Sequence, residues 1–120
     1  MEQGVWPSNY LSNHDSRRQV TYYGNDKEYR KESAKLLAVL NNTVPGNVYM
    51  YQGEEIGMTN ADFENLSQVE DIESHNIYAM AKKLGIPAPL RWKMILRTSR
   101  DHGRTPMQWD ASKNAGFTAG

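Results

Sequence analysis

Apolar residues recur at helical spacing in the first third of the chain. They fall on one face of a helix, at Tyr29, Leu36, Leu37 and Leu40. Asn25 and Glu28 form a capping-box pattern just before this stretch, and the Pro45-Gly46 pair ends it. We therefore expect an amphipathic helix over residues 26–42.

Short runs of strand-forming residues flank this helix. One strand is expected near residues 10–12, and the run Asn47-Val48-Tyr49-Met50-Tyr51 is rich in β-formers and short enough to be a single buried strand. A helix between two short strands is the βαβ unit, whose strands are almost always parallel. The pattern therefore predicts an α/β fold.

A second helical pattern follows in the second half of the chain. Ser67 and Glu70 form another capping box, and helical spacing continues to Gly85, which predicts a helix over residues 68–84. We interpret the acidic cluster Glu70-Asp71-Glu73 as a solvated helix start. After two prolines, a short helix is expected over residues 90–96, and the polar stretch 100–110 has the character of an ordered functional loop.

The composition of the chain excludes some classes of binding partner. The 14 basic and 14 acidic side chains cancel, which argues against nucleic acid or an anionic membrane as a partner. No apolar run approaches the roughly 20 residues that span a bilayer. The absence of cysteine fits a reducing cytoplasm, so we expect a cytoplasmic protein with a small or neutral partner. Neither metal-ligand spacing nor a cofactor motif is present, so no cofactor or metal is expected.

The triplet Asn13-His14-Asp15 follows the first expected strand. If the chain bends there, His14 and Asp15 can reach one ligand, the carboxylate accepting two hydroxyl donors and the imidazole supplying one. This pattern suits a sugar. Taken alone, it is also compatible with a turn capped by Asp15 and a histidine at the surface.

Two further polar groups are candidates for binding. Glu54 and Glu55 are adjacent, so on an extended chain they point apart and do not suit the facing carboxylates, about 5 Å from one another, of a retaining glycosidase. Arg100 and Arg104 are four residues apart and could hold a carboxylate and fix the wall of a pocket. The alternative is that Arg100 and Arg104 belong to an ordinary surface loop.

Three motifs in this order resemble the oligo-1,6-glucosidase branch of glycoside hydrolase family 13. They are Asn13-His14-Asp15 with Arg18, then Tyr51-Gln52-Gly53-Glu54-Glu55-Ile56-Gly57, then Arg100-Asp101-His102-Gly103-Arg104-Thr105-Pro106-Met107-Gln108-Trp109-Asp110. The resemblance covers nearly the whole chain. It implies that residues 1–120 are a partial catalytic domain, the last quarter of a (β/α)8 TIM barrel. This part comprises the seventh strand end, the seventh helix, the eighth strand and the helices after it.

The resemblance also implies roles for the candidate residues. Asp15 is expected to stabilise the transition state through sugar hydroxyls, with His14 as its neighbour. Arg104, Arg100 and Asn13 are expected to line the substrate pocket, and Glu54 to shape its floor. Ser16-Arg17 and Gly103 depart from the commonest residues of the family at these positions.

The implied parent is an α-glucosidase that hydrolyses terminal α-1,6 or α-1,4 bonds of small oligosaccharides with retention. Its nucleophile and acid/base are expected upstream of this chain, so the isolated chain should be inactive. Related alternatives are a trehalose-6-phosphate hydrolase or a sucrose isomerase. Alternatives of another class are a non-catalytic barrel homologue that serves as an interaction domain and a small carbohydrate-binding domain. Unpaired strand edges predict that the isolated chain self-associates.

Overall fold

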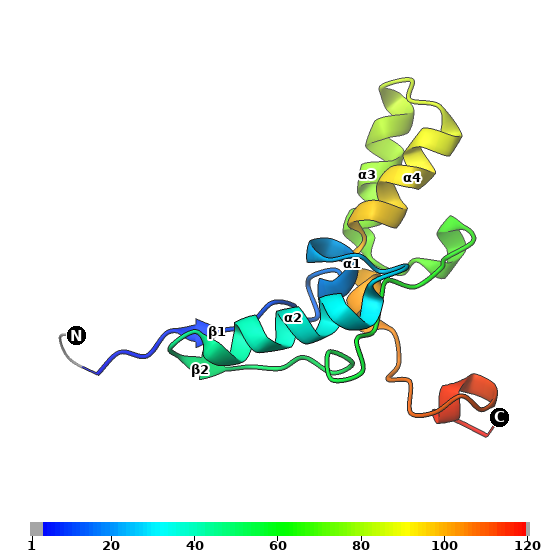
Figure 1. Ribbon diagram of the computed structural model, residues 1–120. Coiled ribbons are helices and arrows are strands. Elements are labelled where there is room, and N and C mark those ends of the chain that lie inside the picture. The colour runs from blue at the N-terminus through cyan, green and yellow to red at the C-terminus, as the bar shows by residue number, and fades with distance from the viewer. Residues whose placement is uncertain (1–3, 120) are drawn as a thin grey trace.

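A computed structural model describes residues 4–119. Its regular elements, shown in Figure 1, are β1 (Ser8–Asn9), α1 (Gln19–Tyr23), α2 (Arg30–Thr43), β2 (Asn47–Val48), η1 (Leu66–Gln68), α3 (Ile72–Lys83), α4 (Ala88–Thr98), η2 (Arg100–Arg104) and η3 (Lys113–Gly116). The three η elements are 3₁₀ turns. The order is that of an α/β chain, as the sequence predicts.

The predicted βαβ unit is present. β1 and β2 pair in parallel, Ser8 opposite Asn47 and Asn9 opposite Val48, and α2 lies in the connection between them. β1 comes earlier than the strand expected near residues 10–12, so those residues form the stretch that leaves the strand. The triplet 13–15 therefore follows β1 and the polar loop 52–57 follows β2, and these two strands lie side by side (Figure 1).

The predicted capping box of α2 is wrong. The Asn25 side chain accepts hydrogen bonds from the backbone N–H groups of Lys27 and Tyr29 in a turn, and the helix begins only at Arg30. Asn25 therefore stabilises the loop before the helix rather than the helix itself. A local turn competes for the same side-chain oxygen that a cap would use.

The start of α3 also differs from the prediction. Ser67 lies in η1, and the residue that caps α3 is Asp71, whose carboxylate accepts from the backbone N–H of Ser74. α3 then runs antiparallel to α4 as a hairpin that projects from the rest of the chain (Figure 1). α4 is longer than the stretch 90–96 that the sequence predicts, since proline is tolerated in a first helical turn.

The chain buries few apolar side chains. Those that are buried include Val20, Leu37, Val69 and Ile95, whereas Leu36 on α2 is 69% exposed. The radius of gyration is 17.0 Å, compared with about 14 Å for a compact chain of this length. Large apolar side chains on α2 therefore face outward instead of into a core. Within residues 4–119, every helix is too short or too polar to cross a membrane.

Candidate functional site

The Asn13-His14-Asp15 triplet forms a turn after β1. The Asn13 side-chain oxygen accepts from the Asp15 backbone N–H at 2.8 Å, and the Asn13 backbone N–H donates to the Ser16 hydroxyl at 2.8 Å. Such a turn fixes the local backbone. The side chains of His14 and Asp15 are 72% and 51% exposed, and His14 Nε2 lies 3.2 Å from Asp15 Oδ2.

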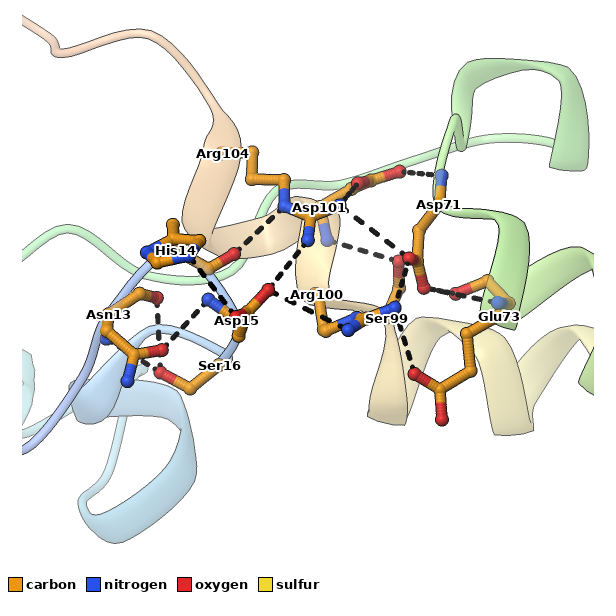
Figure 2. Close-up of polar contacts among 11 residues, drawn as sticks. Asn13, His14, Asp15, Ser16, Asp71, Glu73, Ser99, Arg100, Asp101 and Arg104 are labelled. Carbon is orange, nitrogen blue, oxygen red and sulfur yellow. Dashed lines mark hydrogen bonds and ion pairs between the residues drawn. The ribbon is translucent and has the colours of Figure 1, made fainter.

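Arg104 joins this turn from a distant part of the sequence. Its Nε donates to the His14 carbonyl at 2.9 Å and its Nη2 donates to Asp15 Oδ1 at 2.9 Å (Figure 2). Nη1 of Arg100 lies 3.7 Å from the same oxygen. The structure therefore brings His14, Asp15, Arg100 and Arg104 together. Asn13 lies beside them, but its side-chain oxygen holds the turn.

The close approach of η2 to this turn requires a glycine. A Cβ added to Gly103 would lie 2.4 Å from the Ser16 carbonyl oxygen and 3.0 Å from that of Asn13. Both atoms belong to the backbone and cannot rotate away. Gly103 thus allows the arginine segment to lie directly against the triplet.

Two buried carboxylates lie behind the arginines. Asp71 Oδ1 accepts from Arg100 Nη2 at 2.8 Å and lies 3.6 Å from Arg104 Nη1. Asp101 Oδ1 contacts Arg104 Nη1 at 3.3 Å, and its Oδ2 accepts from the backbone N–H groups of Glu70 and Asp71. The interpretation of the acidic cluster as a solvated helix start is therefore wrong for Asp71. The pattern of an aspartate three residues before Ser74 could have indicated its capping role.

The ionisation of this cluster follows from its contacts. Burial alone would raise the pKa of Asp71, but hydrogen bonds from Arg100 and Ser74 outweigh burial, so the pKa lies below its usual range. Arg100 responds in the opposite sense. The hydrogen bond to Asp71 raises the pKa of its guanidinium. Asp71 and Arg100 are therefore a charged pair at neutral pH.

Arg18 fixes the segments that carry the site. Its side chain is buried and donates to three backbone carbonyls, those of His102, Gln52 and Thr105, at 3.0, 2.5 and 3.2 Å. Burial lowers the pKa of the guanidinium, while the nearby Tyr51 and Glu54 favour its charged form. Arg18 thus joins the segment after the triplet, the loop after β2 and η2. The sequence marks Arg18 only as part of a motif and does not reveal this role.

Glu54 occupies a different position from the arginines. Its Oε1 accepts from the buried Ser12 hydroxyl at 2.5 Å, and its side chain lies beside a cavity of about 450 Å³ between α2 and the loop after β2. Burial raises the pKa of Glu54, and the hydrogen bond from Ser12 opposes this only in part. Glu54 therefore holds the stretch between β1 and the triplet, and its role in substrate binding stays a prediction.

His102 is the third histidine of the chain and lies within η2. It is buried, stacked on Phe63 with ring centroids 5.1 Å apart, and its Nε2 lies 2.8 Å from the Leu96 carbonyl oxygen. Burial lowers its pKa. His102 is thus a neutral packing residue at pH 7, in contrast to the exposed His14.

The arrangement can bind a neutral polyol through one open carboxylate. Asp15 is held on one oxygen by Arg104, while half of its side-chain surface stays accessible to hydroxyl donors. The nearby Asp71 and Asp101 are buried and already hydrogen bonded, so they are not suited to act as nucleophile or general acid. Glu73 is exposed, but its carboxylate is paired with Arg100 at 2.9 Å. In residues 4–119, no group of three acidic, histidine or cysteine side chains could hold a metal ion.

Comparison with known sequences gives consistent matches over the whole chain. The sequence model of the family described as alpha amylase, catalytic domain, matches residues 1–120. The chain is 53% identical to a glucan 1,6-alpha-glucosidase of Streptococcus pneumoniae, over 96% of this chain and 22% of the relative. It is 47% identical to an oligo-1,6-glucosidase of Halalkalibacterium halodurans, over 96% of this chain and 20% of the relative. The chain thus spans about a fifth of the length of the relatives it matches.

Solved structures agree with the sequence relatives. Trehalose-6-phosphate hydrolase of Bacillus licheniformis superposes with a TM-score of 0.91 at 46% identity, over 98% of this chain and 21% of that structure. An isomaltulose synthase of Erwinia rhapontici superposes with a TM-score of 0.88 at 39% identity, over 98% of this chain and 22% of that structure. The backbone of the chain, including its extended shape, therefore matches part of larger enzymes.

Proposed function

The chain belongs to the alpha-amylase catalytic-domain family, and from this premise we propose that it supplies the transition-state-stabilising part of an α-glucosidase active site. The proposed parent reaction is the retaining hydrolysis of a terminal α-1,6-glucosidic bond in a small oligosaccharide. The single observation that carries this proposal is the geometry of Asp15, an exposed carboxylate fixed on one oxygen by Arg104.

The geometry suits stabilisation of positive charge better than covalent catalysis. In retaining hydrolysis the sugar ring becomes an oxocarbenium-like cation, and hydroxyl contacts that strengthen as charge develops lower the barrier. Asp15 can accept sugar hydroxyls, and His14, 3.2 Å away, can add a further hydrogen bond. Because the other carboxylates of this cluster, Asp71, Asp101 and Glu73, are each paired with an arginine, we place the nucleophile and acid/base on a part of the enzyme outside residues 4–119.

We place the chain in the last quarter of a (β/α)8 barrel. In this placement β1 and β2 are the seventh and eighth strands and α2 is the seventh helix. Support comes from the parallel pairing of β1 with β2 and from the polar segments that follow both strands, since barrel enzymes carry their sites on the loops after the strands. The outward-facing apolar side chains of α2, such as Leu36, would then be covered by the rest of the barrel.

The relatives include 1,6-glucosidases and trehalose-6-phosphate hydrolases. Identity is 53% and 47% to the two 1,6-glucosidases above, and 46%, 44% and 42% to trehalose-6-phosphate hydrolases of Bacillus licheniformis, Bacillus subtilis and Escherichia coli, so the margin for a 1,6-glucosidase rests mainly on the Streptococcus pneumoniae relative. The substrate that we propose is therefore an uncharged isomalto-oligosaccharide. A cytoplasmic location is proposed with it, on the ground that the sequence has no cysteine.

The direct test uses the full-length polypeptide that contains these residues. It is incubated separately with isomaltose, trehalose 6-phosphate and sucrose, and the products are followed by NMR. We expect glucose from isomaltose, released first as the α-anomer. Exclusive cleavage of trehalose 6-phosphate or rearrangement of sucrose would change the substrate assignment, and inactivity on all α-glucosides would overturn the proposed function.

A further inference from the structure

The two carboxylate oxygens of Asp71 have separate partners. Oδ2 accepts from the backbone N–H and the hydroxyl of Ser74, which caps α3. Oδ1 contacts the two arginines, Arg100 Nη2 at 2.8 Å and Arg104 Nη1 at 3.6 Å. The same Arg100 nitrogen also lies 2.9 Å from Oε2 of Glu73, whose side chain is 60% exposed. One oxygen therefore serves the helix, and the other lies beside the candidate site.

The same two guanidinium groups also contact Asp15. Arg104 Nη2 and Arg100 Nη1 lie 2.9 and 3.7 Å from Asp15 Oδ1, so each arginine lies between the two carboxylates (Figure 2). The carboxylates differ in their surroundings. The Asp71 side chain is 5% exposed, whereas that of Asp15 is 51% exposed. Asp71 is thus the fixed end of the cluster and Asp15 the end open to a ligand.

The backbone at Asp71 is itself held by Asp101. Its backbone N–H donates to Asp101 Oδ2 at 2.8 Å, and the neighbouring N–H of Glu70 donates to the same oxygen. Asp101 belongs to η2, the segment that also carries both arginines. The start of α3 and η2 are therefore fastened together at the point where Asp71 meets the arginines.

From these contacts we propose that Asp71 is a positioning residue, which holds Arg100 and Arg104 in the orientation that fixes Asp15 for catalysis. This inference rests on the proposed function. Arginine side chains lose considerable rotational freedom when they are held in one orientation, and a buried carboxylate already in place reduces that loss on substrate binding. The carboxylate of Asp71 also offsets part of the positive charge of the two arginines. The arginines therefore cancel less of the negative potential with which Asp15 stabilises a cationic transition state.

Two substitutions separate positioning from helix capping in the full-length enzyme. Asp71→Asn keeps a good capping side chain but removes the charge. Asp71→Glu keeps the charge but places it one methylene further from the helix start. For hydrolysis of an aryl α-glucoside we expect kcat to fall about 100-fold in D71N with little change in KM, and D71E to recover to within about tenfold of wild type. Thermal stability should follow the opposite order, with D71N above D71E.

Ser74→Ala serves as the matched control, because it removes a capping contact without touching the arginines. It should lower the melting temperature and leave kcat unchanged. If D71N keeps wild-type kcat, or if kcat follows the melting temperature across all three variants, Asp71 has only a structural role and the inference is wrong. Inactivity of the wild type on every α-glucoside would instead refute the proposed function.

A crystal structure of D71N tests the inference independently of activity. We expect Arg100 to leave its position beside residue 71 and the contact between Arg104 and Asp15 to change. Unchanged positions of both guanidinium groups would overturn the inference, whether or not the enzyme turns over.

Discussion

Arg104 donates to the carboxylate of Asp15 at 2.9 Å although the two residues are 89 positions apart in the sequence. A second nitrogen of the same guanidinium, Nε, donates to the carbonyl of His14 at 2.9 Å. One side chain thus fixes both the carboxylate and the backbone of the triplet. This double contact requires the planar, forked shape of a guanidinium, because a lysine ammonium at the end of a flexible chain does not span both acceptors in the same way.

Substitution of Arg104 by lysine should therefore impair catalysis even though the charge is kept. In the full-length enzyme we expect kcat/KM for an aryl α-glucoside to fall about 100-fold. The matched control is Arg97→Lys, at an exposed position in the last turn of α4. R97K should behave as wild type. Equal rates for R104K and R97K would show that Arg104 acts only as a positive charge.

Replacement of Gly103 by alanine should separate η2 from the triplet. The added Cβ meets the Ser16 carbonyl oxygen at 2.4 Å, so the backbone has to move, and we expect a loss of roughly 2 kcal/mol in the free energy of unfolding. Gly85→Ala is the control, because alanine at that position strains the backbone without a steric contact. Gly85 has φ +76° and no neighbouring atom within 4 Å of an added Cβ.

Chemical denaturation of both full-length variants measures this difference. Gly85→Ala should cost about 1 kcal/mol, from backbone strain alone. G103A should in addition lose activity, because Arg104 moves with η2. A G103A protein as stable and active as wild type would contradict the close packing of η2 against the triplet.

The fold could be predicted from the sequence where local spacing determines it. The helix around Leu36 and Leu37 and the parallel pairing of the strands that flank it follow from hydrophobic period and turn residues, and the structure confirms both. The predicted strand positions are less accurate, since β1 lies before residues 10–12 and β2 covers only two exposed residues of the run 47–51. The helix starts could not be placed correctly. Asn25 has the right chemistry for a cap but hydrogen bonds within its own loop, and Ser67 lies in η1 while Asp71 caps α3.

The candidate site could likewise be predicted from the sequence only in part. His14, Asp15 and Arg104 could be selected because their motifs stand in a recognisable order, and the structure brings them together. The roles of Arg18 and Asp71 depend on contacts across 34 to 87 and 29 sequence positions, respectively. Local patterns contain no information on such contacts, which is why the sequence marks Arg18 only within a motif and suggests a solvated position for Asp71.

The half-buried carboxyl of Glu54 should make stability depend on pH. Because burial raises its pKa in the folded chain, the folded state binds the proton more tightly than the unfolded state does. This contribution to stability is complete below the unfolded pKa and is lost as the pH rises through the folded pKa. Glu54→Gln imitates the protonated form, and its amide oxygen can still accept from Ser12.

Melting temperatures of E54Q and wild type at two pH values check this pH-dependent contribution of Glu54 to stability. E54Q should melt above wild type at about pH 7.5, and the advantage should disappear near pH 4, where Glu54 itself is protonated. Glu55→Gln, at the exposed neighbouring position, serves as the matched control for loss of a carboxylate. An E54Q protein that is less stable than wild type at both pH values would show that the carboxylate is stabilising as an ion.

The isolated 120-residue chain should associate with itself. α2 presents Leu36 at 69% exposure, and β1 and β2 form a sheet of only two strands with open edges. Light scattering should therefore give a mass above that of a monomer. Leu36→Asp should reduce the association, whereas Lys35→Asp on the same helix should affect it less. A compact monomer with a sharp two-state thermal transition would contradict this expectation.

Asp15→Asn in the full-length enzyme tests most directly whether Asp15 stabilises the transition state. The substituted amide keeps the shape of the side chain but not the charge, and the Asp15 side chain is half exposed, so folding should not depend on it. We predict a fall in kcat of at least about 1,000-fold on an aryl α-glucoside, with an unchanged melting temperature. A D15N enzyme that keeps a kcat within about tenfold of wild type would contradict the account.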